Sequence, residues 1–198
     1  MKQNYFNIVL LGAPGSGKGT QALLLKEKYN LQHASTGDLY RKEIASGSPI
    51  GRRAKQIIDK GELCPDELTL DLLYQFCSSC KNTRGFLLDG VPRNLEQAKM
   101  MDGIKYPHTI PITLALYIEV DKNVVVERLS KRAVIEKRSD DTPEAIWLRI
   151  ELYETQTKPL IEHFKTQNKL ITVNGMQSVE DVFDEICKMI GFRLVCTD

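Results

Sequence analysis

The residues most able to do chemistry lie near the N-terminus, where Gly12–Thr20 has the sequence GAPGSGKGT. A short apolar run from Ile8 to Leu11 precedes it, so the pattern is strand, glycine-rich turn and helix. Such a turn directs backbone N–H groups and the positive end of a helix at one point, which suits a phosphate, and Lys18 can reach terminal phosphates. The residues predicted to hold a triphosphate are Gly15, Ser16, Gly17, Lys18, Gly19 and Thr20.

Gly19 departs from the common loop G-x-x-x-x-G-K-[ST], in which the residue after the lysine offers magnesium a hydroxyl. Either Thr20 supplies the hydroxyl, or Mg²⁺ is held mostly through water and phosphates with an acid as outer-shell partner. Asp89 is the candidate acid, because it ends the apolar run from Gly85 to Leu88 and ligands lie at the carboxyl ends of parallel strands. The simpler alternative makes Asp89 a turn residue before Gly90.

Composition limits the function classes. In 198 residues, 27 basic side chains nearly cancel 26 acidic ones, so strong electrostatic attraction to nucleic acid or membrane is not expected. The first apolar run is too short for a signal peptide or membrane span, and five scattered cysteines favour free thiols in a reducing compartment. Cys77 and Cys80 have zinc-ligand spacing but no second pair nearby, so zinc is not expected. We expect a cytoplasmic protein.

Short apolar runs alternate with longer amphipathic ones, which is typical of an α/β fold with a parallel sheet and crossover helices. With the phosphate loop, this predicts a three-layer P-loop fold. The five expected strands are Asn7–Leu11, Gln32–Ala34, Gly85–Asp89, Leu114–Val120 and Leu170–Val173.

Two helices are indicated by their first residues. Thr142, Pro143 and Glu144 form an N-cap, a first-turn proline and a first-turn acid, and predict a helix to about Thr166. Its expected buried stripe is Ile146, Ile150, Tyr153, Thr157, Leu160 and Phe164. Ser178 with Asp181 resembles a capping box that starts the last helix. The expected buried face of that helix is Val179, Val182, Phe183, Ile186 and Ile190.

Two segments do not fit the sheet pattern. Residues 35–64 contain two short helical pieces broken at Gly47, Pro49 and Gly61, which predicts a helical insertion. Residues 131–141, KRAVIEKRSDD, are charged and lack a clear period, which predicts a mobile loop.

Further motifs follow along almost the whole chain: STGDLYR at 35–41, GELCPDEL at 61–68, GFLLDGVPRNLEQA at 85–98, ERLSKR at 127–132 and RSDD at 138–141. With a phosphate loop in which glycine follows lysine, this order resembles the nucleoside monophosphate kinases, and within them the adenylate kinases. The loop and the DG-x-PR-x-x-x-Q run are the specific parts. The resemblance implies reversible transfer of a phosphoryl group from ATP to AMP, giving two ADP and maintaining the balance of adenine nucleotides.

The resemblance also implies roles at AMP. Arg41 matches the residue on the AMP phosphate, Arg93 a second phosphate-binding arginine, and Gln97 the amide at the adenine edge. The implied AMP-binding residues are Thr36, Arg41, Glu62, Leu63, Cys64, Gly90, Val91, Pro92, Arg93, Gln97, Arg138 and Arg149.

On the ATP side, Arg128 and Arg132 match lid arginines, and Gln177 falls where the family contacts the ATP base. Arginine suits this chemistry because phosphoryl transfer needs mainly alignment and charge neutralisation, and a guanidinium offers a fork of donors that stays charged. The implied catalytic residues are Lys18, Arg93, Arg132, Arg138 and Arg149.

The resemblance divides the chain into a core of residues 1–34, 65–130 and 142–198, an AMP-binding insertion of residues 35–64 and a lid of residues 131–141. Only AVIEK separates Arg132 from Arg138, and no cysteine stands there, so the short lid without zinc is implied. Closure of both segments would keep water from the activated phosphate. The resemblance also implies that Mg²⁺ is the cofactor, that ATP and AMP are the binding partners and that the protein is a monomer.

Three positions depart from the family pattern: Val91 replaces a usual Phe, Cys64 a common Val, and Trp147 a frequent basic residue. Val91 leaves the fit of the acceptor open. Alternatives within the class are UMP or CMP as acceptor and GTP as donor, although Gln97 and Thr36 favour AMP. A GTP-hydrolysing switch would commonly carry N-K-x-D, but NKLI at 168–171 has Ile171 in place of Asp. A non-catalytic relative would be expected to have lost some arginines.

Overall fold

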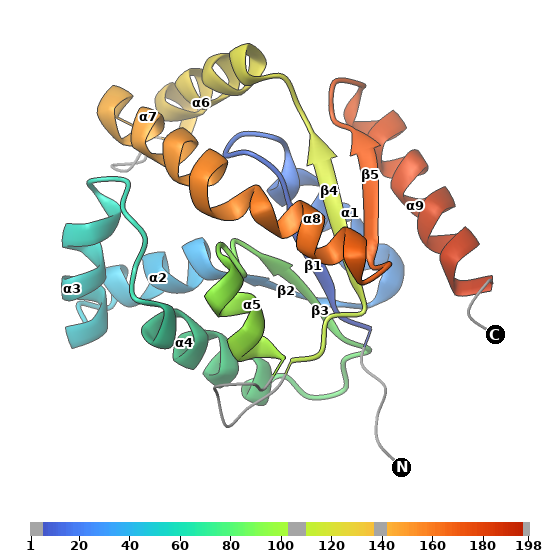
Figure 1. Ribbon diagram of the computed structural model, residues 1–198. Helices are drawn as coiled ribbons and strands as arrows, with labels where there is room; N and C mark the ends of the chain where they lie inside the picture. Colours follow the sequence, from blue (N-terminus) through green and yellow to red (C-terminus); the bar gives the residue numbers. More distant parts are fainter. Residues whose placement is uncertain (1–5, 103–109, 137–141, 196–198) are drawn as a thin grey trace.

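A computed structural model describes residues 6–102, 110–136 and 142–195. Within them, a five-stranded parallel sheet has the order β2-β3-β1-β4-β5 (Figure 1). The strands are β1 (Ile8–Leu11), β2 (Gln32–Ser35), β3 (Phe86–Asp89), β4 (Leu114–Glu119) and β5 (Leu170–Asn174). All five expected strands are confirmed, with ends shifted by no more than one residue.

Helices cover both faces of the sheet and give three layers (Figure 1). Because successive strand residues face opposite sides, Ile8 and Leu10 pack toward α1 and α9, whereas Val9 and Leu11 pack toward α4, α5 and α8. A strand buried on both faces must be apolar throughout, which explains the sequence IVLL. The helices are α1 (Lys18–Tyr29), α2 (Thr36–Ala45), α3 (Pro49–Ile58), α4 (Asp66–Ser79), α5 (Leu95–Met101), α6 (Lys122–Glu136), α7 (Pro143–Leu152), α8 (Pro159–Thr166) and α9 (Val179–Val195).

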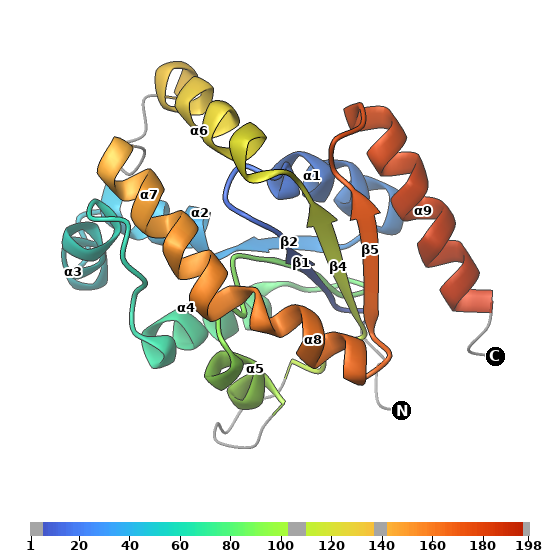
Figure 2. The same ribbon diagram turned by 45° about the horizontal axis from the view of Figure 1, so that its top comes forward.

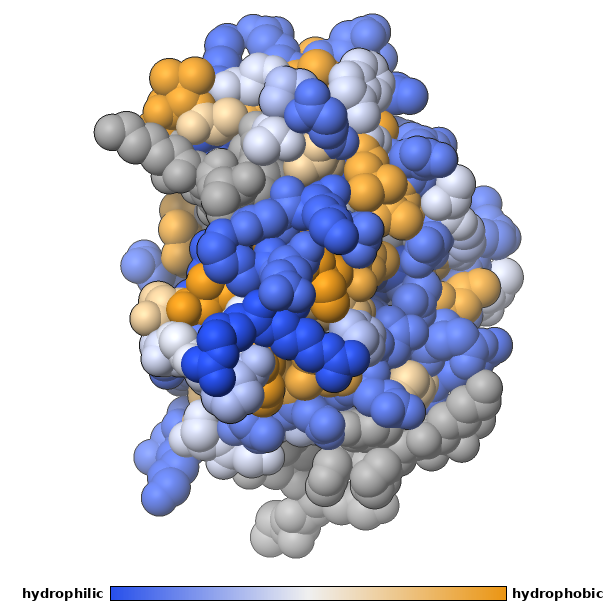
Figure 3. Space-filling model, turned by 90° about the vertical axis from the view of Figure 1, so that its left-hand side faces the viewer, coloured by the Kyte–Doolittle hydropathy of each residue, from blue (hydrophilic) through white to orange (hydrophobic). Residues whose placement is uncertain are grey.

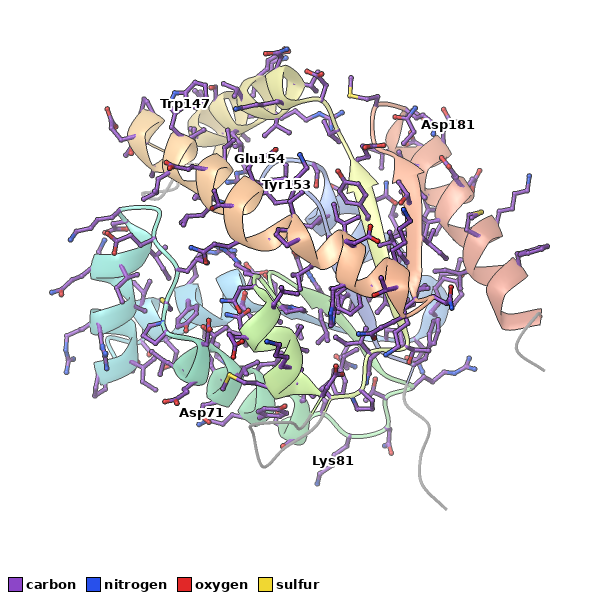
Figure 4. All side chains as sticks on the ribbon, in the orientation of Figure 1. Asp71, Lys81, Trp147, Tyr153, Glu154 and Asp181 are labelled. Atoms are coloured by element: carbon purple, nitrogen blue, oxygen red, sulfur yellow. The ribbon has the colours of Figure 1, made fainter. Side chains whose placement is uncertain are left out.

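The segment from Thr142 to Thr166 is helical as predicted, and the Thr142 hydroxyl caps it by accepting from the N–H of Ala145 at 3.2 Å. It is not one regular α-helix, because a π-helical turn, η1 (Tyr153–Thr157), separates α7 from α8. Pro159 cannot donate a backbone hydrogen bond, and the N–H of Lys158 instead donates to the carbonyl of Tyr153 at 2.8 Å. The predicted stripe faces inward, with Thr157 half-buried and its apolar members buried. Figure 4 labels Tyr153, buried in this turn, and Glu154, exposed beside it.

Two expectations about helices were wrong. Val179 is 44% exposed rather than buried, because it is the first residue of α9 and lines the same cavity as the phosphate loop. Residues 131–136 form the last turns of α6 rather than a loop. KRAVIE contains mostly good helix formers, and Lys131 pairs with Glu127 at 2.6 Å one turn back. Residues 137–141 of the expected loop lie outside the described residues.

The two short helical pieces expected between residues 35 and 64 are present as α2 and α3, which pack against each other. A β-carbon added at Gly51 of α3 would stand 2.0 Å from the Glu43 carbonyl oxygen of α2, so the two backbones meet there. Figure 3 views this side of the molecule, where α3 lies outermost and hydrophilic residues dominate.

α6 and α7 pack against each other, and Figures 1 and 2 show α6 following the carboxyl end of β4. Trp147 of α7 is more than half exposed, and the Lys122 ammonium lies 5.9 Å from its ring centroid (Figure 4). Among the described helices, none combines the length and the apolar character that a membrane crossing requires. Cys64, Cys77, Cys80 and Cys187 are free thiols.

Candidate active site

The phosphate loop joins β1 to α1 at the carboxyl edge of the sheet. Gly12 has φ 147°, and a β-carbon there would stand 2.6 Å from Ser16 Oγ and 2.7 Å from the Ile118 carbonyl, so a side chain does not fit. Gly17, at φ 96°, is the N-cap of α1. The chain therefore turns tightly enough for loop N–H groups and the start of α1 to face one anion.

Lys18 folds back over the loop and donates to the carbonyls of Gly12 and Ala13, both at 2.8 Å. Burial lowers the pKa of Lys18 to about 8; Asp89 acts in the opposite direction, and the charges of nearby arginines lower the pKa further. The arginines that exert this effect are Arg93, Arg149 and Arg132. Four cationic groups are therefore close enough to repel one another, which favours a polyanion between them.

Asp89 ends β3 beside the phosphate loop, because β3 pairs with β1 and Leu10 lies opposite Asp89. Its Oδ2 lies 3.4 Å from His33 Nε2 of β2, a contact that becomes an ion pair when the imidazole is protonated. Burial alone would raise the pKa of Asp89, but His33 and the charges of Lys18 and Arg93 outweigh it and lower the pKa. A β-carbon added at Gly19 would be 4.0 Å from Asp89 Oδ2, so the loop position that lacks a hydroxyl faces this carboxylate.

The turn after β3 holds Arg93 at its backbone and its side chain. The Arg93 N–H donates to Gln97 Oε1 at 2.7 Å, and the Arg93 carbonyl accepts from the Thr157 hydroxyl at 2.7 Å. Arg93 Nε donates to the Gly90 carbonyl at 2.9 Å, and the Thr36 hydroxyl donates to that carbonyl at 3.1 Å. The turn, α2 and the π-helical turn are thus joined around Arg93.

Arg41 of α2 pairs with Asp38 one turn earlier on the same helix. Its guanidinium lies beside Gly37, where an added β-carbon would be 3.2 Å from both terminal nitrogens. Val91 differs from its neighbours in the turn: it is buried in the core with Leu88 and Phe164, whereas Gly90, Pro92 and Arg93 line the cavity.

On the far side of the phosphate loop, Arg128 of α6 donates to the Gly175 carbonyl at 3.2 Å. Gln177 donates from Nε2 to the Asn174 carbonyl at 3.2 Å and to Glu185 Oε2 at 2.6 Å. These bonds connect α6, the turn after β5 and α9 around one end of the site.

A cavity of about 900 Å³ joins all these groups, at the upper end of the usual range for ligand sites. Of the predicted site residues that the structure describes, all but Val91 line it. Arg138 lies outside the described residues. The lining residues are Gly15, Ser16, Gly17, Lys18, Gly19, Thr20, Thr36, Arg41, Glu62, Leu63, Cys64, Asp89, Gly90, Pro92, Arg93, Gln97, Arg128, Arg132, Arg149 and Gln177.

The family model described as adenylate kinase matches residues 10–169. The chain belongs to the adenylate kinase family. It is similar to the adenylate kinase of Bacteroides fragilis, with 41% identity over 184 residues, 93% of this chain and 97% of that protein. Similarity to the adenylate kinase of Clostridium tetani is 38% over 214 residues, covering 93% of this chain and 98% of the relative. A Xanthomonas euvesicatoria adenylate kinase is 40% identical over 184 residues, covering 93% and 98%.

As a member of the adenylate kinase family, the protein is a phosphotransferase of the nucleoside monophosphate kinase class. Its site includes residues whose contacts the sequence did not reveal. Thr157 was expected only as part of a buried stripe, although a hydroxyl among apolar residues is a signal that a polar partner exists. His33 and Tyr40 also line the cavity. His33 lies in none of the motifs, and Tyr40 lies in STGDLYR, where only Thr36 and Arg41 were given a role.

Proposed function

We propose that this protein catalyses reversible, magnesium-dependent phosphoryl transfer from ATP to AMP, producing two ADP and balancing the adenine nucleotides. We base this on the cavity in which the phosphate loop and the Arg93–Gln97 turn face a common space. A protein that only hydrolysed a triphosphate would need one nucleotide site, whereas this cavity extends beyond the loop to the α2–α3 side.

ATP would bind with its phosphates on the loop of residues 15–20 and Lys18. Arg128 and Gln177 enclose the end of the cavity beyond the loop, between α6 and the turn after β5, which suits the adenosine of ATP. Val179 adds an exposed apolar surface there against which a base can pack.

AMP would bind on the α2–α3 side. Thr36 begins α2, and Arg41 lies in the middle of that helix, available to exchange its exposed partner Asp38 for the AMP phosphate. Residues 62–64 line the same side, and the Gln97 amide would contact the adenine edge. Val91 points into the core, so valine in place of the family's usual Phe would change the packing behind the turn and leave the space for the acceptor nucleotide unchanged.

Between the two nucleotides, Lys18, Arg93, Arg132 and Arg149 would align the phosphates and neutralise the charge that spreads over the transferring group. We assign Arg138 to the same clamp from its sequence motif alone. Most of these groups are guanidiniums, which donate two parallel hydrogen bonds to phosphate oxygens, so the same residues bind the substrates and hold them in line.

Mg²⁺ would bind beside Gly19, Thr20 and Asp89. No group of three or more His, Cys, Asp or Glu side chains in the described part of the chain could hold a metal by itself. Magnesium does not need such a group, since it commonly uses one carboxylate, waters and substrate phosphates. The lowered pKa of Asp89 keeps this carboxylate charged for that role. When bound, the ion would neutralise phosphate charge and hold the phosphates in one geometry.

We further propose that residues 35–64 form the AMP-binding unit and residues 131–141 a short lid on a core formed by the rest of the chain. The Clostridium tetani alignment extends over 214 residues and the Bacteroides fragilis alignment over 184 for the same 93% of this chain, so the clostridial protein contains residues that this chain lacks. A short lid agrees with that difference. The family resemblance also implies a cytoplasmic monomer.

The test is a phosphoryl-transfer assay with magnesium-ATP and each of AMP, CMP, UMP and GMP. We expect kcat/KM for AMP to exceed that for each other acceptor at least tenfold, because the site's polar groups stay unpaired with the wrong base. If UMP or CMP reacts as well as AMP, the role given to Gln97 is wrong. A parallel series with GTP in place of ATP tests the donor.

A further inference from the structure

The side-chain amide of Gln97 is hydrogen-bonded at both ends inside the protein. Gln97 is only 2% exposed yet lines the cavity. Its Nε2 donates to Asp66 Oδ1 at 2.7 Å, and its Oε1 accepts from the Arg93 N–H at 2.7 Å. Each end has two hydrogen-bonding positions, two protons on nitrogen and two lone pairs on oxygen, so one donor and one acceptor position can still face a ligand.

Asp66 is itself held in place. It lies half-buried in the first turn of α4, where its two carboxylate oxygens accept from Asn94 Nδ2 at 3.1 and 3.2 Å. Asn94 in turn caps α5 by accepting from the Gln97 N–H at 2.7 Å. The start of α4 is thus joined to the start of α5 through three polar side chains, and the position of Asp66 is fixed relative to Gln97.

Only one orientation of the Gln97 amide fits these neighbours. A carboxylate can only accept, and a backbone N–H can only donate. A flipped amide would turn its NH₂ toward the Arg93 N–H and its oxygen toward the Asp66 carboxylate, giving two repulsive contacts and leaving buried polar groups unpaired. We infer that Asp66 is a positioning residue that locks the Gln97 amide and thereby makes the acceptor site select a 6-aminopurine over a 6-oxopurine.

The selectivity follows from the edge of the base. Adenine presents a donor at its 6-amino group and an acceptor at N1, which matches amide oxygen and amide NH₂ in one order. Hypoxanthine has a 6-oxo acceptor and an N1–H donor, so it requires the amide in the reverse order. An unrestrained amide rotates to suit either base, whereas a locked amide leaves the wrong base with clashing donors and acceptors. This inference rests on the proposed contact between Gln97 and the base of AMP.

The test compares AMP and IMP, which differ only at this edge, as acceptors for the wild-type protein and for Asp66→Asn. Asparagine is nearly isosteric but can present its NH₂ to a flipped Gln97 oxygen. Because one of two restraints is removed, we expect the ratio of kcat/KM for AMP to that for IMP to fall about tenfold. We expect the change to lie in the acceptor KM, with the KM for ATP unchanged. Should Asp66→Asn not fold, Asp66→Ala removes the same acceptor.

Glu67→Gln is the matched control, since it removes one carboxylate charge from the next residue in the first turn of α4, which is exposed and does not contact the amide. It should leave the AMP-to-IMP ratio unchanged. If Asp66→Asn lowers kcat/KM for both acceptors by the same factor, Asp66 is merely structural and the inference is overturned. Gln97→Leu distinguishes a wrong base contact from a wrong role of Asp66 in holding the amide. An unchanged ratio in Gln97→Leu rejects the base contact itself, whereas a ratio lost in Gln97→Leu but kept in Asp66→Asn rejects only the lock.

Discussion

Lys18 is the residue whose ionisation depends most clearly on the state of the site. Burial brings its pKa to about 8, so the nucleotide-free protein loses this charge above that pH, although the ordinary lysine value is 10.5. Because the folded pKa is below the unfolded value, charging Lys18 costs stability below pH 8, and that cost disappears as pH rises from 8 to 10.5. A triphosphate beside the ammonium favours its charged form again.

ATP binding should therefore take up a proton at Lys18 in alkaline solution. Calorimetric titration at pH 9 in two buffers of different ionisation enthalpy should give uptake approaching one proton, and at pH 7 uptake near zero. Lys18→Met should abolish the uptake at pH 9 and reduce turnover by orders of magnitude. Equal heats in both buffers at pH 9 would contradict the lowered pKa.

Arg93 is held at its N–H, its carbonyl and its Nε, as expected for a group that must meet a phosphate without reorganisation. Arg93→Ala should lower kcat about a thousandfold, by analogy with other arginines at transferring phosphates. Steady-state assays of phosphoryl transfer should show the lower kcat, and thermal unfolding should show little change in stability. Arg84→Ala, an exposed arginine before the opposite end of β3, is the control and should behave as wild type. Normal turnover in Arg93→Ala would refute the assignment.

At the scale of elements, the sequence was informative where one local rule decides the structure. Apolar runs predicted β1, β3 and β4, and Thr142 predicted its helix start, because burial on two faces and capping leave clear patterns. The predicted strands β2 and β5 are confirmed as well, although QHAS is mostly polar and LITVN alternates between buried and more exposed residues. The π-helical turn could not be predicted from the stripe that contains Thr157. Pro159 marks a break in hydrogen bonding, but the pattern does not say that the break places a hydroxyl on the Arg93 carbonyl. Residues 131–136 were not predicted to be helical, because the segment KRAVIEKRSDD is highly charged and shows no clear apolar period.

Thr157→Val tests whether the π-helical turn positions Arg93. Valine keeps the shape but leaves the Arg93 carbonyl without its 2.7 Å donor, so we expect kcat to fall about tenfold. Thr157→Ser should retain most activity because it keeps the hydroxyl. Thr155→Val is the control, since Thr155 of the same π-helical turn is exposed and donates only to the Glu151 carbonyl one turn earlier, in α7. Equal kcat for the two valine variants would show that the contact has no functional role.

Gly51→Ala tests the packing of α2 against α3. The added methyl would stand 2.0 Å from a backbone carbonyl, so the helices must separate. We expect a loss of stability of about 1–3 kcal/mol and a raised KM for AMP, with the KM for ATP nearly unchanged. Denaturant titration and steady-state kinetics would measure both. Lys55→Ala is the control, because it changes an exposed residue of the same helix. Gly47→Ala would not serve as a control, since Gly47 has φ 67° and a side chain there would be strained. An equal rise in both KM values would contradict a separate AMP-binding unit.

The whole molecule brings together groups that are distant in sequence, and here prediction depended on the family resemblance. Spacing alone identified the phosphate loop and Asp89, because both follow strands of a parallel sheet. Nothing in the spacing places Arg149 or Gln177 at the same cavity. The packing of α7 against α6 beside the phosphate loop brings in Arg149, and the turn between β5 and α9 brings in Gln177. The partner of Gln97 was equally hidden, since Asp66 precedes it by 31 positions and belongs to another helix.

We propose that the cavity transfers a phosphoryl group between two nucleotides rather than to water. The most direct measurement is quantitative chromatography of the nucleotides and phosphate after purified protein is incubated with magnesium-ATP and AMP. We predict that ATP and AMP disappear in equal amounts, that two ADP form for each ATP consumed, and that inorganic phosphate stays at background. Production of one ADP and one phosphate per ATP, with AMP unchanged, would contradict transfer to AMP and indicate a hydrolase.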